Sequence, residues 1–180
     1  MADSTAWPHD AALRAWWVEP ARLLAGEYPG SSSYQKTVAK VQLLVEAGVD
    51  SIVDLTSPRD GLDSYLDVLN IEADKAGRSI ARFAHPIPDW GVVDHDGYDR
   101  IVARIRGEID SGRTVYVHCW AGKGRTSTVI GCLLIDGGLD YDDAIDRIAQ
   151  LRAKTRAGSD RLPETPSQHR VLRERAARPR

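Results

Sequence analysis

The sequence predicts an α/β fold: a central, mostly parallel sheet of about four to five strands, flanked by helices, with an α-rich C-terminal half. Short runs of apolar and β-branched residues, typical of buried strands, alternate with segments whose apolar residues recur at helical spacing. Glycines and prolines separate these segments. The 180 residues suit one domain, residues 1–180, because domains usually hold roughly 100–200 residues.

Three strands and two helices are expected in the first half of the chain. Residues 23–28 form a short strand ended by a Pro-Gly pair, and 51–55 form a buried strand. Valines recur at helical spacing between 38 and 45, and 62–76 is a second helix; a glycine closes each. Residues 79–84 are the third strand. The stretch 85–91 that follows is a stiff loop, since proline fixes its own backbone angle.

The second half is expected to be richer in helix. Apolar residues from 98 to 109 mark an amphipathic helix, and 114–118 is a β-branched and aromatic strand. Further helices are expected over 126–135, over 141–151 and from about 165 to 178. The segment 152–180 carries nine Lys/Arg against three Asp/Glu, which fits a solvated helix face or contact with a phosphate-rich partner. Residues 1–12 are expected to be flexible, although Trp7, Trp16 and Trp17 suggest packing nearby.

Composition and charge exclude several classes of protein. Hydrophobic residues make up 42% and charged residues 28% of the chain, near the globular average. No apolar run is long enough for a membrane span, and the start lacks the features of a secretory signal. The net charge of −2 argues against nucleic-acid binding. Two cysteines are too few for a disulfide framework or a zinc site, so no metal or cofactor is predicted and a cytoplasmic location is expected.

The stretch from His118 to Thr126 (HCWAGKGRT) lies between a strand and a helix and carries the predicted chemistry. Successive backbone N–H groups of such a loop can converge on one point, because glycines permit the backbone angles and the helix N-terminus adds positive charge. Arg125 adds a planar fork that binds two oxygens at once. The loop is therefore predicted to bind a tetrahedral dianion through residues Trp120, Ala121, Gly122, Lys123, Gly124 and Arg125.

Cys119 stands at the base of this loop. The same N–H groups would stabilise a thiolate, which could attack phosphorus and give a phosphocysteine. Thr126 places a hydroxyl where it could donate to the departing sulfur. Asp89, on the stiff loop 30 residues upstream, is the candidate general acid and later base, since loops that follow parallel strands meet at one edge of the sheet.

Cys-x5-Arg-Thr preceded by His, with an upstream Ile-Pro-Asp, resembles the cysteine-dependent protein tyrosine phosphatase superfamily, and within it the compact dual-specificity-like branch. The resemblance spans about residues 23–151. It implies Cys119 as nucleophile, Arg125 as phosphate ligand, Asp89 as acid and Thr126 as the assisting hydroxyl, with His118 tuning the thiolate. Some members also carry a water-orienting glutamine. The candidate here is Gln168; the alternative is a surface glutamine that opens the last helix.

The predicted function is hydrolysis of phosphotyrosine, with or without phosphoserine and phosphothreonine, in proteins, or of a small phosphomonoester. An inositol phosphate or phosphoinositide phosphatase is the alternative, because Lys123 could bind an extra phosphate; a solvent-facing lysine is the simpler interpretation. A phosphate-binding pseudophosphatase and a sulfurtransferase are further alternatives. Trp90 is interpreted as loop packing or as a stacking surface for substrate, and Cys132 as a core residue or a redox partner of Cys119.

Overall fold

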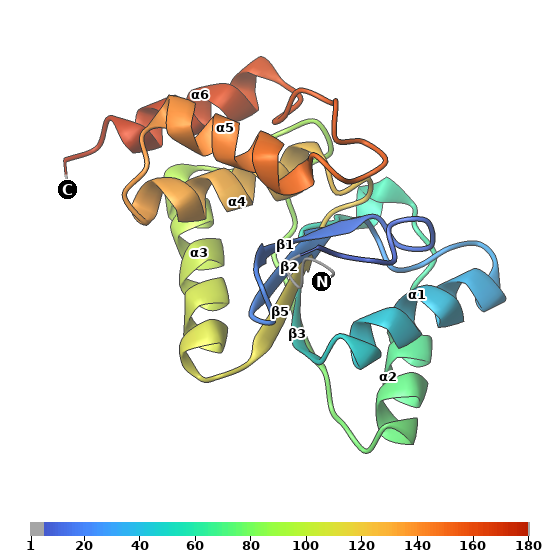
Figure 1. Cartoon of the computed structure of the whole chain (residues 1–180). Helices are drawn as coiled ribbons and strands as arrows, with labels where there is room; N and C mark the ends of the chain where they lie inside the picture. The colour runs from blue at the N-terminus through green and yellow to red at the C-terminus, as the bar shows by residue number, and fades with distance from the viewer. Residues whose placement is uncertain (1–5, 180) are drawn as a thin grey trace.

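A five-stranded sheet in the order β1-β2-β5-β3-β4 runs through the computed structural model, which describes residues 6–179 (Figure 1). The four strands β2, β5, β3 and β4 are parallel, and β1 pairs antiparallel with β2. The mostly parallel α/β sheet that the sequence predicts is thus confirmed. The strands are β1 Ala15–Glu19, β2 Leu23–Gly26, β3 Val49–Asp54, β4 Ala81–Ala84 and β5 Thr114–His118.

Helices cover both faces of the sheet. On one face lie α1 Tyr34–Glu46 and α2 Leu66–Lys75; on the other lie α3 His95–Asp110, α4 Gly124–Asp136, α5 Tyr141–Arg152 and α6 Pro166–Ala176 (Figure 1). Side chains alternate between the two cores along β5: Val115 and Val117 pack against the α3–α6 side, whereas Tyr116 packs against the α1–α2 side. Such burial on both faces explains why the centre of β5 is apolar, whereas the edge strand β4 is only half-buried or exposed along its length. None of the helices within 6–179 has the length and apolar composition to cross a membrane.

The strand β1 is not among the strands that the sequence predicts. Trp16 is buried in the core on the α3–α6 side. Trp7 packs edge-on against Trp17 with ring centroids 6.3 Å apart, and its indole N–H donates to the Leu13 carbonyl at 2.8 Å. The flexibility expected for 1–12 lies partly outside the described residues, at 1–5. Within residues 6–12, in contrast, Trp7 is held against β1 and Asp10 pairs with Arg156.

Helices α1 and α3 begin at Tyr34 and His95, a few residues before the apolar spacing that predicts them, and two other predicted helices also differ at their starts. The helix α2 begins at Leu66 rather than at 62, because a 3₁₀ turn at Pro58–Asp60 ends in the left-handed Gly61 and the chain stays irregular up to Tyr65. The helix α4 begins at Gly124, two residues earlier than expected. The anion-binding loop predicted from sequence therefore already contains the first residues of a helix.

Part of the positive charge of the basic C-terminal segment is buried in ion pairs. Arg175 of α6 is only 6% exposed, and it donates two hydrogen bonds to the Asp136 carboxylate, at 2.7 and 2.6 Å. It also lies 2.8 Å from Asp99 of α3. These ion pairs fasten α6 to α3 and α4, so this arginine belongs neither to a solvated face nor to a surface for an external phosphate.

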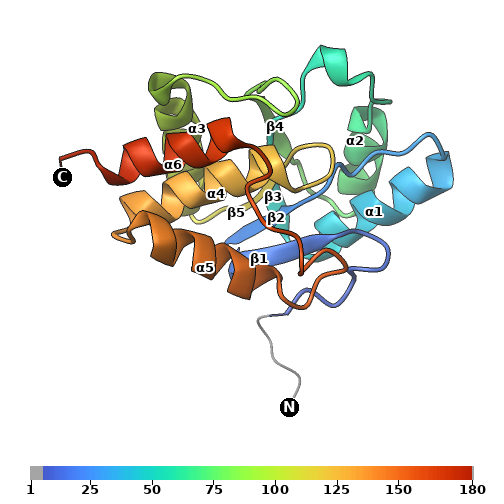
Figure 2. The ribbon, with the colours of Figure 1, turned by 90° about the horizontal axis from the view of Figure 1, so that it is seen from above.

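The carboxyl ends of the four parallel strands share one edge of the sheet. The loops that follow β4 and β5 lie close to the start of α6 at this edge (Figure 2). Asp89 and Cys119 come from two of these loops, as parallel pairing requires.

Candidate active site

Cys119 directly follows β5 and lies at a cavity of about 290 Å³. The cavity is lined by residues of the loop 119–125, by Asp89 and Trp90 from the loop after β4, by Glu164 from the segment before α6 and by Gln168 from the first turn of α6. Cys119 is 3% exposed, and it lines this cavity. The structure thus brings the predicted nucleophile and the predicted acid into one small space.

Three consecutive carbonyl groups of the loop are held from outside. The Cys119 carbonyl accepts a hydrogen bond from Nδ1 of His118 at 3.1 Å, and the Trp120 carbonyl accepts one from the N–H of Tyr28 at 2.8 Å. The Ala121 carbonyl accepts one from Nη2 of Arg14 at 2.6 Å. A trans peptide directs its C=O and its N–H in opposite directions, so the next N–H groups along the chain turn to the inside of the loop. This is the arrangement that binds an anion.

Gly122 is the one position in this loop where packing and backbone both demand glycine. Its φ is +66°, in the left-handed region, and a Cβ there would overlap the backbone of Gly26 at the end of β2. The loop can lie this close to β2 only because residue 122 has no side chain.

Arg125 is fixed at the base of the cavity. Its side chain is 2% exposed, and Nη1 donates to Asp60 at 2.7 Å and to the Ile87 carbonyl at 3.1 Å. Nη2 lies 3.1 Å from Oδ1 of Asp89. Burial opposes the charge of Arg125, but the hydrogen bond that Arg125 donates to Asp60 and the neighbouring negative groups raise its pKa. The sequence did not indicate that Asp60 contacts Arg125, because the residues around Asp60 indicate only that it caps the 3₁₀ turn.

The side chain of Asp89 is 39% exposed at the cavity mouth. Its Oδ1 also accepts the N–H of Trp90 at 3.0 Å. Trp90 has a φ of +59° and is 62% exposed, so it does not pack into the loop. Trp120 is 53% exposed and lines the same cavity. Two aromatic side chains therefore stand at the entrance to Cys119.

His118 is completely buried behind the loop. Burial lowers the pKa of His118 below its ordinary value, although Asp54 opposes this, and the ring is therefore neutral at pH 7. The Cys119 carbonyl can only accept a hydrogen bond, so the proton of the neutral His118 ring lies on Nδ1, 3.1 Å from that carbonyl. Nε2 of His118 is then the acceptor for the Tyr65 hydroxyl, 2.9 Å away.

Thr126 and Gln168 differ in whether their polar side-chain atoms already form hydrogen bonds. The Thr126 hydroxyl is buried and has no hydrogen-bond partner within residues 6–179. Gln168 is also fully buried, so it is not the surface glutamine of the alternative interpretation. Its Oε1 accepts the N–H groups of Glu164 and Thr165 at 3.0 and 3.1 Å, and its Nε2 donates to the Gly91 carbonyl at 3.4 Å. Gln168 thus ties the start of α6 to the loop that carries Asp89.

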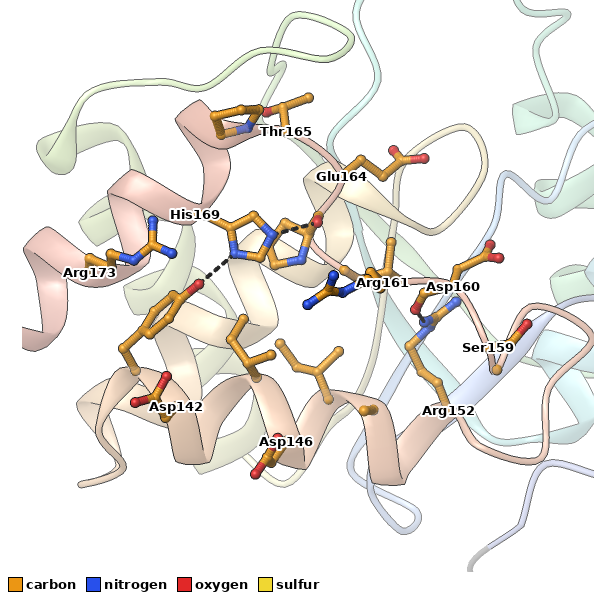
Figure 3. Close-up of a pocket in the computed structure, with 18 residues that line it drawn as sticks. Asp142, Asp146, Arg152, Ser159, Asp160, Arg161, Glu164, Thr165, His169 and Arg173 are labelled. Carbon is orange, nitrogen blue, oxygen red and sulfur yellow. Dashed lines mark hydrogen bonds between the residues drawn. The ribbon is translucent and has the colours of Figure 1, made fainter.

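Two carboxylates missed by the sequence reasoning approach the loop from the segment before α6. Oδ2 of Asp160 lies 2.6 Å from Nζ of Lys123, so this lysine is ion-paired rather than simply solvent-facing. Oε2 of Glu164 accepts the N–H of Gly124 at 3.0 Å. Both residues also border a groove of about 820 Å³ between α5 and α6, and their carboxylates point away from Asp142 and Asp146 on its far wall (Figure 3).

The segment that carries Glu164 is anchored from the groove side. His169 of α6 bonds to the Tyr141 hydroxyl at 2.8 Å and to the Pro163 carbonyl at 2.8 Å, as the dashed lines in Figure 3 show. No local sequence pattern predicts these contacts, because they join α5, α6 and the segment between them in the folded chain.

Cys132 is a core residue, as the sequence indicates. It is fully buried on α4, and burial raises the pKa of its thiol to about 12. Both cysteines are free thiols. Within residues 6–179, no group of three His, Cys, Asp or Glu side chains is placed to hold a metal ion.

Comparisons with known proteins agree with this geometry. Residues 13–179 match the family model described as the Swiss Army Knife protein, DSP-PTPase phosphatase domain. The chain is 31% identical over 70 residues to cyclin-dependent kinase inhibitor 3 of Rattus norvegicus, covering 38% of this chain and 33% of that protein. It is 46% identical over 65 residues to protein tyrosine phosphatase type IVA 3 of Mus musculus, covering 36% of each. The matches thus span about a third of these relatives.

Solved structures share the fold. The active form of Tk-PTP superimposes with a TM-score of 0.71 and 23% identity, over 96% of this chain and 99% of that one. PTPMT1 in complex with PI(5)P superimposes with a TM-score of 0.58 and 22% identity, over 87% of this chain and 90% of that one.

Proposed function

The chain belongs to the DSP-PTPase family of cysteine-dependent phosphatases, and on that basis we propose that it hydrolyses phosphomonoesters in proteins through a phosphocysteine intermediate. The observation that carries the proposal is the single cavity in which Cys119, Arg125 and Asp89 meet inside a loop of converging N–H groups. We extend the proposal to one catalytic domain in a reducing, cytoplasmic compartment, because the nucleophile must be a free thiol.

In the first step, the sulfur of Cys119 attacks phosphorus while the bond from phosphorus to the leaving oxygen breaks. The loop N–H groups and Arg125 hold the remaining oxygens, and Asp89 gives its proton to the leaving oxygen. In the second step, water attacks phosphorus, Asp89 takes a proton from it, and the sulfur–phosphorus bond breaks to release inorganic phosphate. The Thr126 hydroxyl, which has no other partner within 6–179, stabilises the departing thiolate. Gln168 positions the Asp89 loop for both steps through Gly91.

The entrance to the cavity supports an aromatic substrate. Trp90 and Trp120 are both more than half exposed there, and exposed aromatic rings stack well on a phosphotyrosine ring. Phosphotyrosine in proteins is therefore the proposed main substrate, with or without phosphoserine and phosphothreonine.

The inositol phosphate alternative depends on Lys123. This ammonium lies at the cavity, but Asp160 already neutralises it. The Glu164 carboxylate adds a second negative charge beside the loop. Both features disfavour a substrate that carries several phosphates.

The first experiment measures phosphate release from p-nitrophenyl phosphate and from a phosphotyrosine peptide. We expect Cys119→Ser to lose essentially all turnover but still to bind inorganic phosphate, since the N–H groups and Arg125 remain. Cys132→Ser is the matched control, because its sulfur is buried on α4 away from the cavity. Retention of a tenth of the wild-type activity by Cys119→Ser would exclude sulfur as the nucleophile. Thiocyanate production by the wild type would favour a sulfurtransferase instead.

A further inference from the structure

Arg14 reaches the phosphate-binding loop from the start of β1, 107 residues away in the chain. Sheet pairing places it there: Ala15 is opposite Gly26, and Gly26 is opposite His118. The residues just beyond this row, Arg14 and Cys119 among them, share the edge of the sheet where the site lies. The Arg14 side chain is 16% exposed, and its Nη2 donates to the Ala121 carbonyl at 2.6 Å.

This hydrogen bond fixes the direction of one peptide group. With the Ala121 carbonyl drawn outward to Arg14, the N–H of Gly122 in the same planar group points the opposite way, into the loop. A peptide flip would reverse both groups and turn the carbonyl oxygen, which is partly negative, toward a bound phosphate. One hydrogen-bond donor would become a repulsive acceptor.

Gly122 itself does little to prevent the Ala121–Gly122 peptide from flipping. A flip changes the φ of residue 122 by about 180°, and glycine tolerates both signs of φ. No larger residue can replace it, because its φ is +66° and a Cβ would overlap the backbone of Gly26. The residue type that close packing demands is therefore the type least able to hold the peptide in place, and the restraint has to come from a hydrogen bond to Ala121.

Arg14 is itself held for this task. Its backbone N–H donates to Oε1 of Glu27 at 3.1 Å, and Nη2 lies 3.5 Å from Oε2 of the same carboxylate. Lys40 and Arg156 also pair with Glu27, at 3.2 and 3.5 Å. Arg156 makes its other contacts with Asp10, so it shares the carboxylate with Arg14 but does not contact the loop.

We propose that Arg14 is a positioning residue for phosphate transfer: it keeps the Ala121–Gly122 peptide oriented so that the Gly122 N–H binds a phosphate oxygen. The proposal rests on the proposed function of the loop, but it makes a separate statement about phosphate binding. It assigns no contact between Arg14 and substrate.

The experiment compares Arg14→Ala and Arg14→Lys with the control Arg156→Ala. Affinity for inorganic phosphate is measured by calorimetry, and kcat/KM is measured on p-nitrophenyl phosphate and phenyl phosphate. Loss of one oriented N–H donor is expected to lower kcat/KM by roughly 10–100-fold in Arg14→Ala, somewhat less than outright removal of such a donor. The loss should be equal for both substrates, because this donor acts on the oxygens that stay on phosphorus. Arg14→Lys should recover part of it, since an ammonium can also donate to Ala121.

A backbone amide spectrum separates positioning from a general loss of structure. Phosphate should shift the Gly122 N–H signal strongly in the wild type and in Arg156→Ala, but weakly in Arg14→Ala. Equal phosphate affinity in Arg14→Ala and Arg156→Ala would overturn the proposal, and so would a loss confined to phenyl phosphate. If the wild type binds phosphate but hydrolyses neither ester, the proposed function fails, while the phosphate affinities still decide the role of Arg14. If Arg14→Ala does not fold, Arg14→Lys is compared with Arg156→Ala by the same criteria.

Discussion

Replacing Gly122 by alanine tests whether the loop really depends on its close approach to β2. The added Cβ would lie 2.6 Å from both the nitrogen of Glu27 and the carbonyl oxygen of Gly26. These are backbone atoms of a buried strand end, so they cannot rotate away as the tip of a side chain could. The φ of +66° adds a second penalty, because an L side chain is strained in the left-handed region.

A matched position isolates the two contributions. Gly77, after α2, also has a φ of +66°, but a Cβ there would meet nothing within 4 Å. Gly77→Ala should therefore show the backbone strain alone, about 1–2 kcal/mol. Gly122→Ala should add about 1–3 kcal/mol for overpacking. The expected totals are about 1–2 kcal/mol for Gly77→Ala and about 2–5 kcal/mol for Gly122→Ala.

The measurement is the free energy of unfolding from urea denaturation of the wild type and both variants, with phosphate affinity measured alongside. Gly77→Ala should keep the wild-type affinity for phosphate, because it lies far from the loop in the chain and outside the cavity. Gly122→Ala should lose affinity, since the loop must move away from Gly26. Equal destabilisation by the two substitutions would refute the reasoning, because it would show that the backbone of β2 yields freely.

Three further predictions concern catalysis, substrate choice and pH. Asp89→Asn should lower kcat on phosphotyrosine peptides by about 10²–10⁴-fold but affect p-nitrophenyl phosphate much less, because an activated phenol hardly needs a proton. If kcat depends on the pKa of the leaving group in the same way in Asp89→Asn as in the wild type, Asp89 is not the general acid. Lys123→Ala should affect KM for polyphosphorylated inositols and for p-nitrophenyl phosphate to the same extent, because Asp160 already neutralises the ammonium; a rise in KM confined to polyphosphorylated inositols would show that Lys123 binds a second phosphate. Burial lowers the pKa of His118 in the folded chain. The neutral ring therefore contributes its full stabilisation above the ordinary pKa of about 6.5, and this stabilisation is lost as the pH falls through the lowered pKa. The free energy of unfolding should decline less between pH 7 and 5 in His118→Asn than in the wild type.

The parallel strands were predictable because each is a short run with buried apolar residues, on both faces in β2, β3 and β5 and partly, at alternate residues, in the edge strand β4. Their order along the chain, with helices between them, also fixes the edge at which Asp89 and Cys119 meet. β1 was missed for a related reason. Its residues AWWVE are buried at most positions rather than on alternate ones, so no two-residue period is visible. Such a short run is equally consistent with a terminal segment that packs against the fold without forming a strand.

The start of α2 was misjudged because apolar spacing continues beyond the helix. Leu62 and Leu66 stand four residues apart, as on one helix face, and both pack against the core on the α1–α2 side. However, Leu62 does so from an irregular segment that follows the left-handed Gly61. Periodicity reports which side chains are buried, and it does not require that a helix carries them.

The proposed anion-binding loop could be recognised in the sequence because it is local: Cys119, the glycines and Arg125 lie within seven consecutive residues. The groups that hold this loop are not local. Each outward carbonyl needs a donor, but the identity of that donor depends on which strands are neighbours. Arg14 reaches Ala121 only because β1 pairs with β2 and β2 with β5. Failure to predict β1 and failure to identify Arg14 are thus a single error, because the strand that was missed is the one that brings the arginine to the loop.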